Sequence, residues 1–167
     1  MCEKYLGTGP LLVSKDTELP AQETIQSSVK LVFLYFSMHN CPPCLEFTPV
    51  FAELYKEQEE KLFEVVFCSG DPTTEEFTKY FADMPWLSMP WKDARIKDLA
   101  SQFCVKGVPR LICLSTKGEI VNDNCLKMID QYGPQAIEDL LAKCWSRGII
   151  NSLNYLLSKA LGFWGFG

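Results

Sequence analysis

The sequence predicts an α/β domain in which a central mixed β-sheet carries helices on both faces. Short apolar runs at residues 30–37 and 62–69 are each followed by a segment that predicts a helix. Further along, the Val-Pro step at residues 108–109 introduces a pattern typical of a β-hairpin. The order strand, helix, strand, helix, loop, helix, hairpin, helix places parallel and antiparallel strands in one sheet.

Composition limits the class of protein. The chain has 167 residues, 47% of them apolar and 22% charged, which suits one globular domain with an appendage. The net charge of −5 and the lack of any Lys/Arg run argue against a nucleic-acid surface, which needs a basic face. The N-terminal stretch MCEKYLGTGP lacks the apolar region of a secretory signal. We therefore expect the eight cysteines in a reducing, cytoplasmic compartment, with one special pair rather than four bridges.

The first half of the chain contains the two central strands. The run KLVFLYFS, residues 30–37, is nearly all apolar and rich in β-formers, which predicts a strand buried on both faces. The run LFEVVFCS, residues 62–69, predicts a second strand of the same kind. Apolar residues recur between them at the spacing of a helix: Phe47, Val50, Phe51 and Leu54.

The second half alternates helix, loop and hairpin. The acidic residues that follow Asp71 predict the start of a helix, and the proline-punctuated segment MPWLSMPW, residues 84–91, predicts a loop. Residues 93–103 predict another helix. The segment RLICLSTKGEIV after Pro109 predicts two strands joined by a turn at residues 116–118.

The C-terminal region carries two amphipathic helical patterns. The first, at residues 134–144, completes a predicted domain of residues 1–145. Residues 146–167 form an extra amphipathic tail with an apolar stripe along residues 149–164. The tail is too short and too polar to span a bilayer. We expect the stripe to be covered by its own domain, by a partner protein or by a membrane surface.

The segment HNCPPC, residues 39–44, carries the predicted chemistry. A thiolate attacks disulfides and a thiol barely does, and a helix N-terminus stabilises a thiolate through its free amides and dipole. Cys41 falls at the N-cap, with Pro42 and Pro43 as the first helical residues. Neither proline can donate, which leaves the N–H of Cys44 to reach the Cys41 sulfur. We expect Cys41 to be the exposed nucleophile and Cys44 the cysteine that resolves the mixed disulfide.

A CxxC pair can also be half of a zinc site or a purely structural pair. Zinc takes four ligands, whereas this chain has one histidine, His39, and no second CxxC. We therefore expect no metal and no cofactor, and a structural pair stays open. His39 would lower the pKa of Cys41 if it were cationic, and would have no such effect as an ordinary solvated loop residue.

These residues connect the chain to a known family. The run LVFLYFSMHNCPPCLEFTPVFAEL resembles the active-site segment of the tryparedoxin and nucleoredoxin branch of the thioredoxin superfamily. The segments KYLG, MPWLSMPW and VPRLICLSTKGEIV are similar to further segments of that branch, so the resemblance covers about residues 4–142. It implies a thioredoxin fold and thiol–disulfide exchange through Cys41 and Cys44.

The resemblance also implies a substrate-binding face. Pro109 matches the family's cis-proline beside the CxxC, and Val108 matches the residue whose backbone meets an extended substrate. Asn40, Trp86 and Arg110 complete the expected substrate-binding set. The family has Trp in place of Asn40 and Thr in place of Arg110, so we expect an altered docking face. Arg110 would repel a polyamine-bearing cation such as trypanothione if it faces the site.

Two functions of different classes follow. The first is a tryparedoxin-like dithiol–disulfide oxidoreductase that reduces protein disulfides, such as those of peroxidases. Its electrons would come from a low-molecular-weight dithiol or a reductase. The second is a thioredoxin-fold interaction module with little turnover, tethered by its C-terminal helix at a partner or a membrane periphery. Both cysteines of the motif favour the enzyme, whereas the missing tryptophan before Cys41 favours the module.

Overall fold

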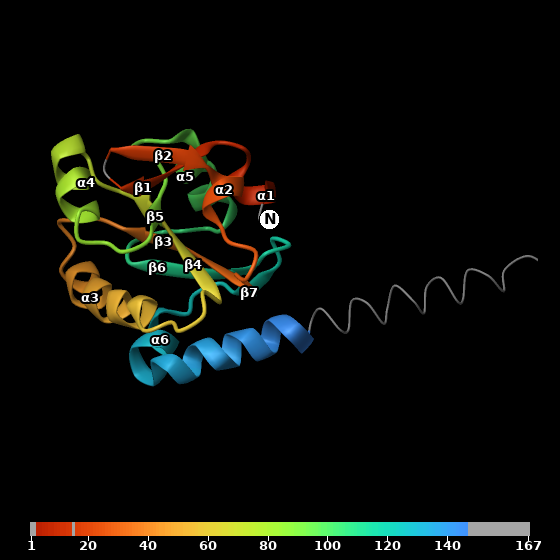
Figure 1. Ribbon diagram of the computed structural model, residues 1–167. Coiled ribbons are helices and arrows are strands. Elements are labelled where there is room, and N and C mark those ends of the chain that lie inside the picture. The colour runs from red at the N-terminus through yellow and green to blue at the C-terminus, as the bar shows by residue number, and fades with distance from the viewer. Residues whose placement is uncertain (1–2, 15, 147–167) are drawn as a thin grey trace, which may run out of the picture.

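The structure is a computed structural model that describes residues 3–14 and 16–146 (Figure 1). Strands of the described residues form one seven-stranded sheet in the order β2-β1-β5-β4-β3-β6-β7. The early strands β3 and β4 lie near its centre and the N-terminal strands lie at one edge. Later strands therefore join the sheet on both sides of the predicted central pair, β5 beside β4 and β6 beside β3.

The central strands occur where the apolar runs predict them. β3 (Leu31–Ser37) and β4 (Phe63–Ser69) are parallel, and all their residues are buried. β6 (Arg110–Ser115) runs antiparallel to β3, and β7 (Ile120–Asn122) runs antiparallel to β6. β5 (Leu87–Ser88) runs parallel to β4 within the segment predicted as a loop. The predicted mixed sheet is confirmed.

The sequence analysis missed the hairpin at the edge of the sheet. β1 (Pro10–Ser14) and β2 (Thr17–Pro20) pair with each other, and β1 joins β5 through the single pair Leu12 and Ser88. Two residues of β1 are buried and none of β2 is. An edge hairpin with so little buried surface lacks the apolar alternation by which a strand is recognised in a sequence.

One face of the sheet is covered by four helices. They are α3 (Pro42–Lys56), α4 (Thr74–Phe81), α6 (Leu126–Tyr132) and a helix at residues 134–146 that follows α6 (Figure 1). The sequence predicts all of these helices except α6. Aromatic side chains dominate the core beneath them: Phe33, Tyr35, Phe47, Phe51, Phe63, Phe67, Phe77 and Trp86.

The opposite face is covered by α1 (Glu3–Leu6), α2 (Ala21–Thr24) and α5 (Ala94–Gln102). Alternate residues of a strand point to opposite faces, so the side chains of β3 contribute to two separate cores. Residues of this second core include Val32, Leu34, Phe36, Leu99 and Phe103. The prediction of a sheet with helices on both faces is confirmed.

The predicted tail lies outside the described residues. The helix at residues 134–146 fits the pattern that predicts the last helix of the domain. The division between residues 145 and 146 and the stripe at 149–164 therefore stay predictions. None of the helices in the described part of the chain combines the length and the apolar character needed to cross a bilayer.

Candidate active site

The cysteine pair lies at the start of α3, just after the loop that follows β3. Cys41 is the N-cap of α3, and Pro42 and Pro43 are its first two helical residues, as the sequence predicts. Cys41 and Cys44 form a disulfide with their Cα atoms 5.1 Å apart. In this disulfide form the Cys41 side chain makes no capping hydrogen bond, so the expected bond from the Cys44 N–H is not formed.

The two cysteines differ in burial, although by less than expected. Cys41 is 8% exposed and Cys44 is 0% exposed. The expectation of an openly exposed nucleophile is therefore wrong, while the order of the two residues is as expected. The Cys41 sulfur lies 3.7 Å from the carbonyl oxygen of Val108, which helps to cover it. Little of the Cys41 side chain is therefore open to a substrate disulfide.

The peptide bond between Val108 and Pro109 is cis, as the resemblance implies. The Val108 carbonyl faces the Cys41 sulfur, so the start of β6 lies against the N-terminal end of α3. A cavity of about 410 Å³ opens on the other side of the proline, between α3 and α6. Its lining includes Pro43, Phe47, Pro109, Asn124 and Leu126.

Asn40 directly precedes Cys41 and Arg110 directly follows Pro109, and the two side chains make different contacts. Asn40 is exposed, and its side-chain amide donates to the carboxylate of Glu76 in α4. Arg110 donates from Nε to the backbone oxygen of Asp123 at 2.9 Å, and its guanidinium lies 3.5 Å from the Asp123 carboxylate. The Arg110 charge is therefore countered, which weakens the expected repulsion of a cation.

Trp86 does not line a substrate groove, and that prediction is wrong. Its side chain is 2% exposed and packs under α3. The ring centroid lies 5.3 Å from Phe51, 5.7 Å from Tyr55 and 6.0 Å from Tyr35. The physical reason is β5, which begins at the next residue and points the indole into the aromatic core. Trp91, in contrast, is half-buried and donates from Nε1 to the backbone oxygen of Asp71 at 3.0 Å.

A cluster of hydroxyl groups beneath Cys44 is a feature that the sequence analysis missed. The Thr48 hydroxyl donates to the Cys44 carbonyl at 2.8 Å and lies 2.8 Å from the Tyr35 hydroxyl. The Tyr80 hydroxyl lies 2.6 Å from Thr48 Oγ1, 2.9 Å from Ser37 Oγ and 3.3 Å from the Cys44 carbonyl. Burial raises the pKa of Tyr35. The cluster holds the first turn of α3 against the sheet and α4.

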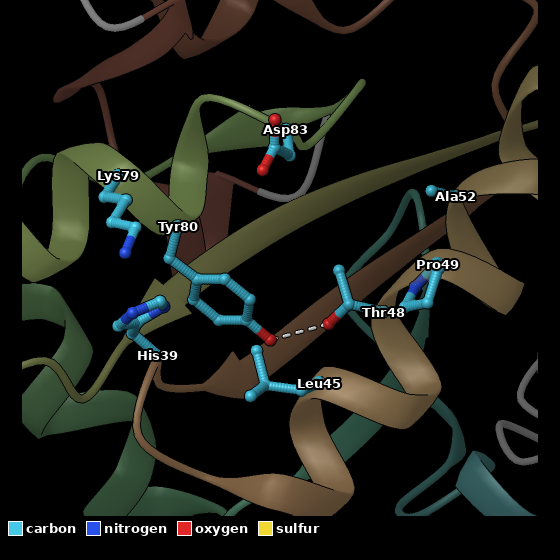
Figure 2. A pocket seen from close by; sticks show the side chains of 8 residues that line it. All are labelled: His39, Leu45, Thr48, Pro49, Ala52, Lys79, Tyr80 and Asp83. Atoms are coloured by element: carbon cyan, nitrogen blue, oxygen red, sulfur yellow. Dashed lines mark hydrogen bonds between the residues drawn. The ribbon is translucent and has the colours of Figure 1, made fainter.

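A cavity of about 240 Å³ lies between α3 and α4, beside this cluster (Figure 2). Figure 2 shows the Tyr80 and Thr48 side chains meeting across it. The residues that line it are His39, Leu45, Thr48, Pro49, Ala52, Lys79, Tyr80 and Asp83. His39 is half-buried against the Tyr80 ring, with 5.8 Å between the ring centroids. The alternative that His39 is an ordinary solvated loop residue is therefore wrong.

A buried carboxylate fixes the loop before the nucleophile. Asp71 is 4% exposed and accepts from the backbone N–H of His39 at 2.6 Å and from the Ser69 hydroxyl at 2.7 Å. Because Asp71 follows β4, these bonds tie the ends of the two central strands together. The helix start predicted after Asp71 is correct, but the sequence gives no sign of this contact.

Two of the other cysteines are poor nucleophiles. Burial raises the pKa of the Cys68 thiol, and it raises that of Cys125 to about 12. Cys113 is also buried, whereas Cys104 is exposed. Among the described residues, the disulfide at the start of α3 thus combines a cysteine pair, a helix N-terminus and a nearby backbone carbonyl, that of Val108. This arrangement suits thiol–disulfide exchange.

The sequence and the fold both match known proteins. A family model described as thioredoxin-like matches residues 28–120. A probable nucleoredoxin 1 of Arabidopsis thaliana is 43% identical over 109 residues. That match covers 64% of this chain and 19% of the plant protein, so the chain spans about a fifth of this relative.

Solved structures of tryparedoxins match most of the fold. Tryparedoxin I from Crithidia fasciculata superposes with a TM-score of 0.71 at 36% identity, covering 80% of this chain and 94% of that protein. A tryparedoxin II complexed with glutathionylspermidine superposes with a TM-score of 0.69 at 32% identity. This second match covers 80% of this chain and 93% of the tryparedoxin.

Proposed function

Because this chain belongs to the thioredoxin-like family, in its tryparedoxin and nucleoredoxin branch, we propose that it is a dithiol–disulfide oxidoreductase that reduces protein disulfides. The observation that carries the proposal is the Cys41–Cys44 disulfide at the N-terminus of α3. The carbonyl of Val108, which lies 3.7 Å from the Cys41 sulfur, supplies a backbone acceptor for an extended substrate.

The exchange takes place in two steps. The Cys41 thiolate attacks one sulfur of the substrate disulfide, forms a mixed disulfide and releases the other substrate sulfur as a thiolate. The Cys44 thiolate then attacks the Cys41 sulfur of the mixed disulfide and releases the second substrate thiolate. The protein is left with the Cys41–Cys44 disulfide, and the substrate has gained two electrons and, from solvent, two protons.

An external dithiol must return the protein to its reduced form. We infer a low-molecular-weight dithiol or a reductase as the electron donor, and protein disulfides such as those of peroxidases as acceptors. The tryparedoxin II complex with glutathionylspermidine shows that this similar protein binds a low-molecular-weight thiol, which supports a small thiol compound as the donor. We also propose a cytoplasmic location, since buried cysteines that form no disulfide, such as Cys68 and Cys125, suit a reducing compartment.

Insulin reduction by dithiothreitol tests the oxidoreductase proposal. The wild-type protein should accelerate the precipitation of insulin chains, and Cys41→Ser should abolish the acceleration. Cys44→Ser should instead accumulate a mixed disulfide through Cys41, which captures the acceptor protein and can be identified by mass spectrometry. A wild-type protein that behaves like Cys41→Ser would contradict the proposal.

One observation favours the interaction module as a second candidate. Cys41 is 8% exposed, which restricts access to large substrates. In that case the docking face and the tail at residues 149–164 would serve to hold a partner or a membrane surface. The same Cys44→Ser trap separates the candidates, because a module with little turnover captures no disulfide-linked protein.

A further inference from the structure

The side chain of Asn40 is tied to a carboxylate from another part of the chain. Asn40 immediately precedes the nucleophile and is exposed, so its side chain is available to a substrate bound at Cys41. Its Nδ2 donates to Oε1 of Glu76, which lies in the first turn of α4. The residue beside the reactive sulfur is therefore coupled to a negative charge.

The Glu76 carboxylate is held in place from its own helix as well. Thr73 is the N-cap of α4, and its hydroxyl accepts from the Glu76 N–H at 3.2 Å and lies 3.0 Å from Glu76 Oε2. Both carboxylate oxygens thus meet neutral donors. In the described part of the chain, Glu76 belongs to none of the ion pairs. The cations Lys61, Arg95 and Arg110 pair with other carboxylates. Glu76 is half-buried, so its charge is partly shielded from bulk water.

On the side of β6 the charges near the site are of both signs, since the cavity beside Pro109 is lined by Glu46, Lys127 and Asp130. There Cys41 meets the neutral carbonyl of Val108, and the guanidinium of Arg110 is bonded to Asp123. A peptide that crosses Cys41 with its backbone at Val108 would extend a flanking side chain toward Asn40 and Glu76. From this arrangement we propose that Asn40 and Glu76 form a selectivity element that favours disulfides whose cysteine is flanked by a cationic residue. The inference rests on the proposed oxidoreductase function.

Three peptide disulfides test the proposal. Each is a disulfide-linked dimer of one short peptide, and the residue beside the cysteine is Lys, Ser or Glu. Pre-reduced protein is mixed with each dimer and the second-order rate constant of reduction is measured. We expect the rate constant to fall in the order Lys, Ser, Glu, with a ratio of roughly ten between the extremes at low salt. The ratio should shrink in 0.5 M salt because about 4 Å of screening length remains there.

Two charge-neutralising variants on the same helical turn provide the comparison. Glu76→Gln keeps the shape and the acceptor for Asn40 but removes the charge, and its Lys-to-Glu ratio should fall to about one. Glu75→Gln removes an equal charge from the adjacent exposed residue, and its ratio should stay within about twofold of the wild type. Thermal melts of both variants establish that they are folded.

The possible failures are distinguishable. A wild-type protein that reduces the Ser peptide but does not discriminate Lys from Glu overturns the selectivity element alone. Equal losses of discrimination in Glu76→Gln and Glu75→Gln also overturn it, because a diffuse charge at the helix N-terminus would then explain the effect. A wild-type protein that reduces none of the three peptides overturns the oxidoreductase function and this inference with it.

Discussion

At the scale of single residues, the combination of a helix N-terminus and partial exposure distinguishes the Cys41 thiol from the others. Cys41 is the less buried member of the disulfide and stands at a helix N-terminus. Burial raises the pKa of Cys68 and Cys125, which keeps those thiols protonated near neutral pH. We predict that limiting iodoacetamide labels Cys41 first.

Mass spectrometry of the alkylated peptides checks this order. Cys104 is exposed and is the natural competitor, so Cys104→Ser serves as the control and should leave the labelling of Cys41 unchanged. Earlier labelling of Cys44 or Cys68 would show that the roles of nucleophile and resolving cysteine are assigned wrongly.

Asn40 stands where the family resemblance implies a tryptophan. We predict that Asn40→Trp raises activity toward tryparedoxin-type peroxidase substrates, because the indole replaces a polar contact with an apolar docking surface and breaks the bond to Glu76. A peroxidase-coupled assay measures the change, and Cys104→Ser should change it less. If both variants behave alike, specificity lies elsewhere, for example at Arg110.

Glu64 is a buried carboxyl far from the catalytic pair. It is 3% exposed, accepts from the Tyr55 hydroxyl at 2.8 Å and lies 3.3 Å from the Lys61 ammonium. Burial raises its pKa above the ordinary 4.5, and Lys61 only partly offsets this. A raised carboxyl pKa gives stability that is complete below the ordinary value and is lost as pH rises through the folded-state value.

The pH dependence of unfolding therefore reports on Glu64. We predict that Glu64→Gln gains stability relative to the wild type between pH 4 and pH 8, by about 1 kcal/mol or more. Urea unfolding of both proteins at the two pH values measures the difference. Parallel stability curves would mean that the carboxyl titrates normally in the folded protein.

For single residues, the sequence predicts chemical roles better than it predicts contacts between side chains on different elements. Cys41, Cys44 and the cis bond at Pro109 follow from local motifs and from a family resemblance. Trp86 could not be placed in this way, because its burial depends on β5 and on aromatic rings from distant segments. The bond between Asn40 and Glu76 was missed for the same reason, since no local pattern relates residues on different elements.

At the scale of elements, one residue at the start of α4 both stabilises the helix and contacts the carboxylate next to the docking face. Thr73 caps this helix and also contacts the carboxylate that holds Asn40. We predict that Thr73→Ala lowers the free energy of unfolding by about 1 kcal/mol. Thr74→Ala, at the first helical residue, is the control and should cost much less. Urea unfolding measures both, and equal losses would show that the cap contributes nothing special.

The elements that the sequence predicts are those in which an apolar run or a helical period of apolar residues marks the buried positions. β3 and β4 are buried along their whole length, and α3 alternates buried and exposed residues at helical spacing. β1, β2 and β5 are short or open to solvent, so their strand conformation depends on neighbours that only the folded chain supplies. α6, with Ile129 as its buried residue, carries too little pattern to be recognised.

At the scale of the whole molecule, the catalytic domain should not need its tail. The helix at residues 134–146 already packs on the core through Ile137 and Leu140. We predict that removing residues 149–167 leaves the melting temperature and insulin reduction unchanged and abolishes binding to vesicles or to a partner. Each large side chain of the stripe would contribute roughly 1.5–3 kcal/mol if it were buried in the domain.

Calorimetry and vesicle flotation of the full-length and truncated proteins measure these effects. A truncated protein that melts many degrees lower, together with a full-length chain that ignores vesicles, would identify the tail as part of the core. The full-length protein with Cys41→Ser is the control, since it should bind vesicles like the wild type while lacking activity.

The hydroxyl cluster has a consequence for the path of the proton in the second step of exchange. Tyrosine, threonine and serine hydroxyls are uncharged at neutral pH, and burial holds the pKa of Tyr35 above its ordinary value. The hydroxyls of Thr48 and Tyr80 already bond the Cys44 carbonyl. The cluster thus supplies orientation and no buried acid or base. We therefore expect the proton that Cys44 gives up to pass to the departing substrate thiolate or to water, and not into the hydroxyl cluster.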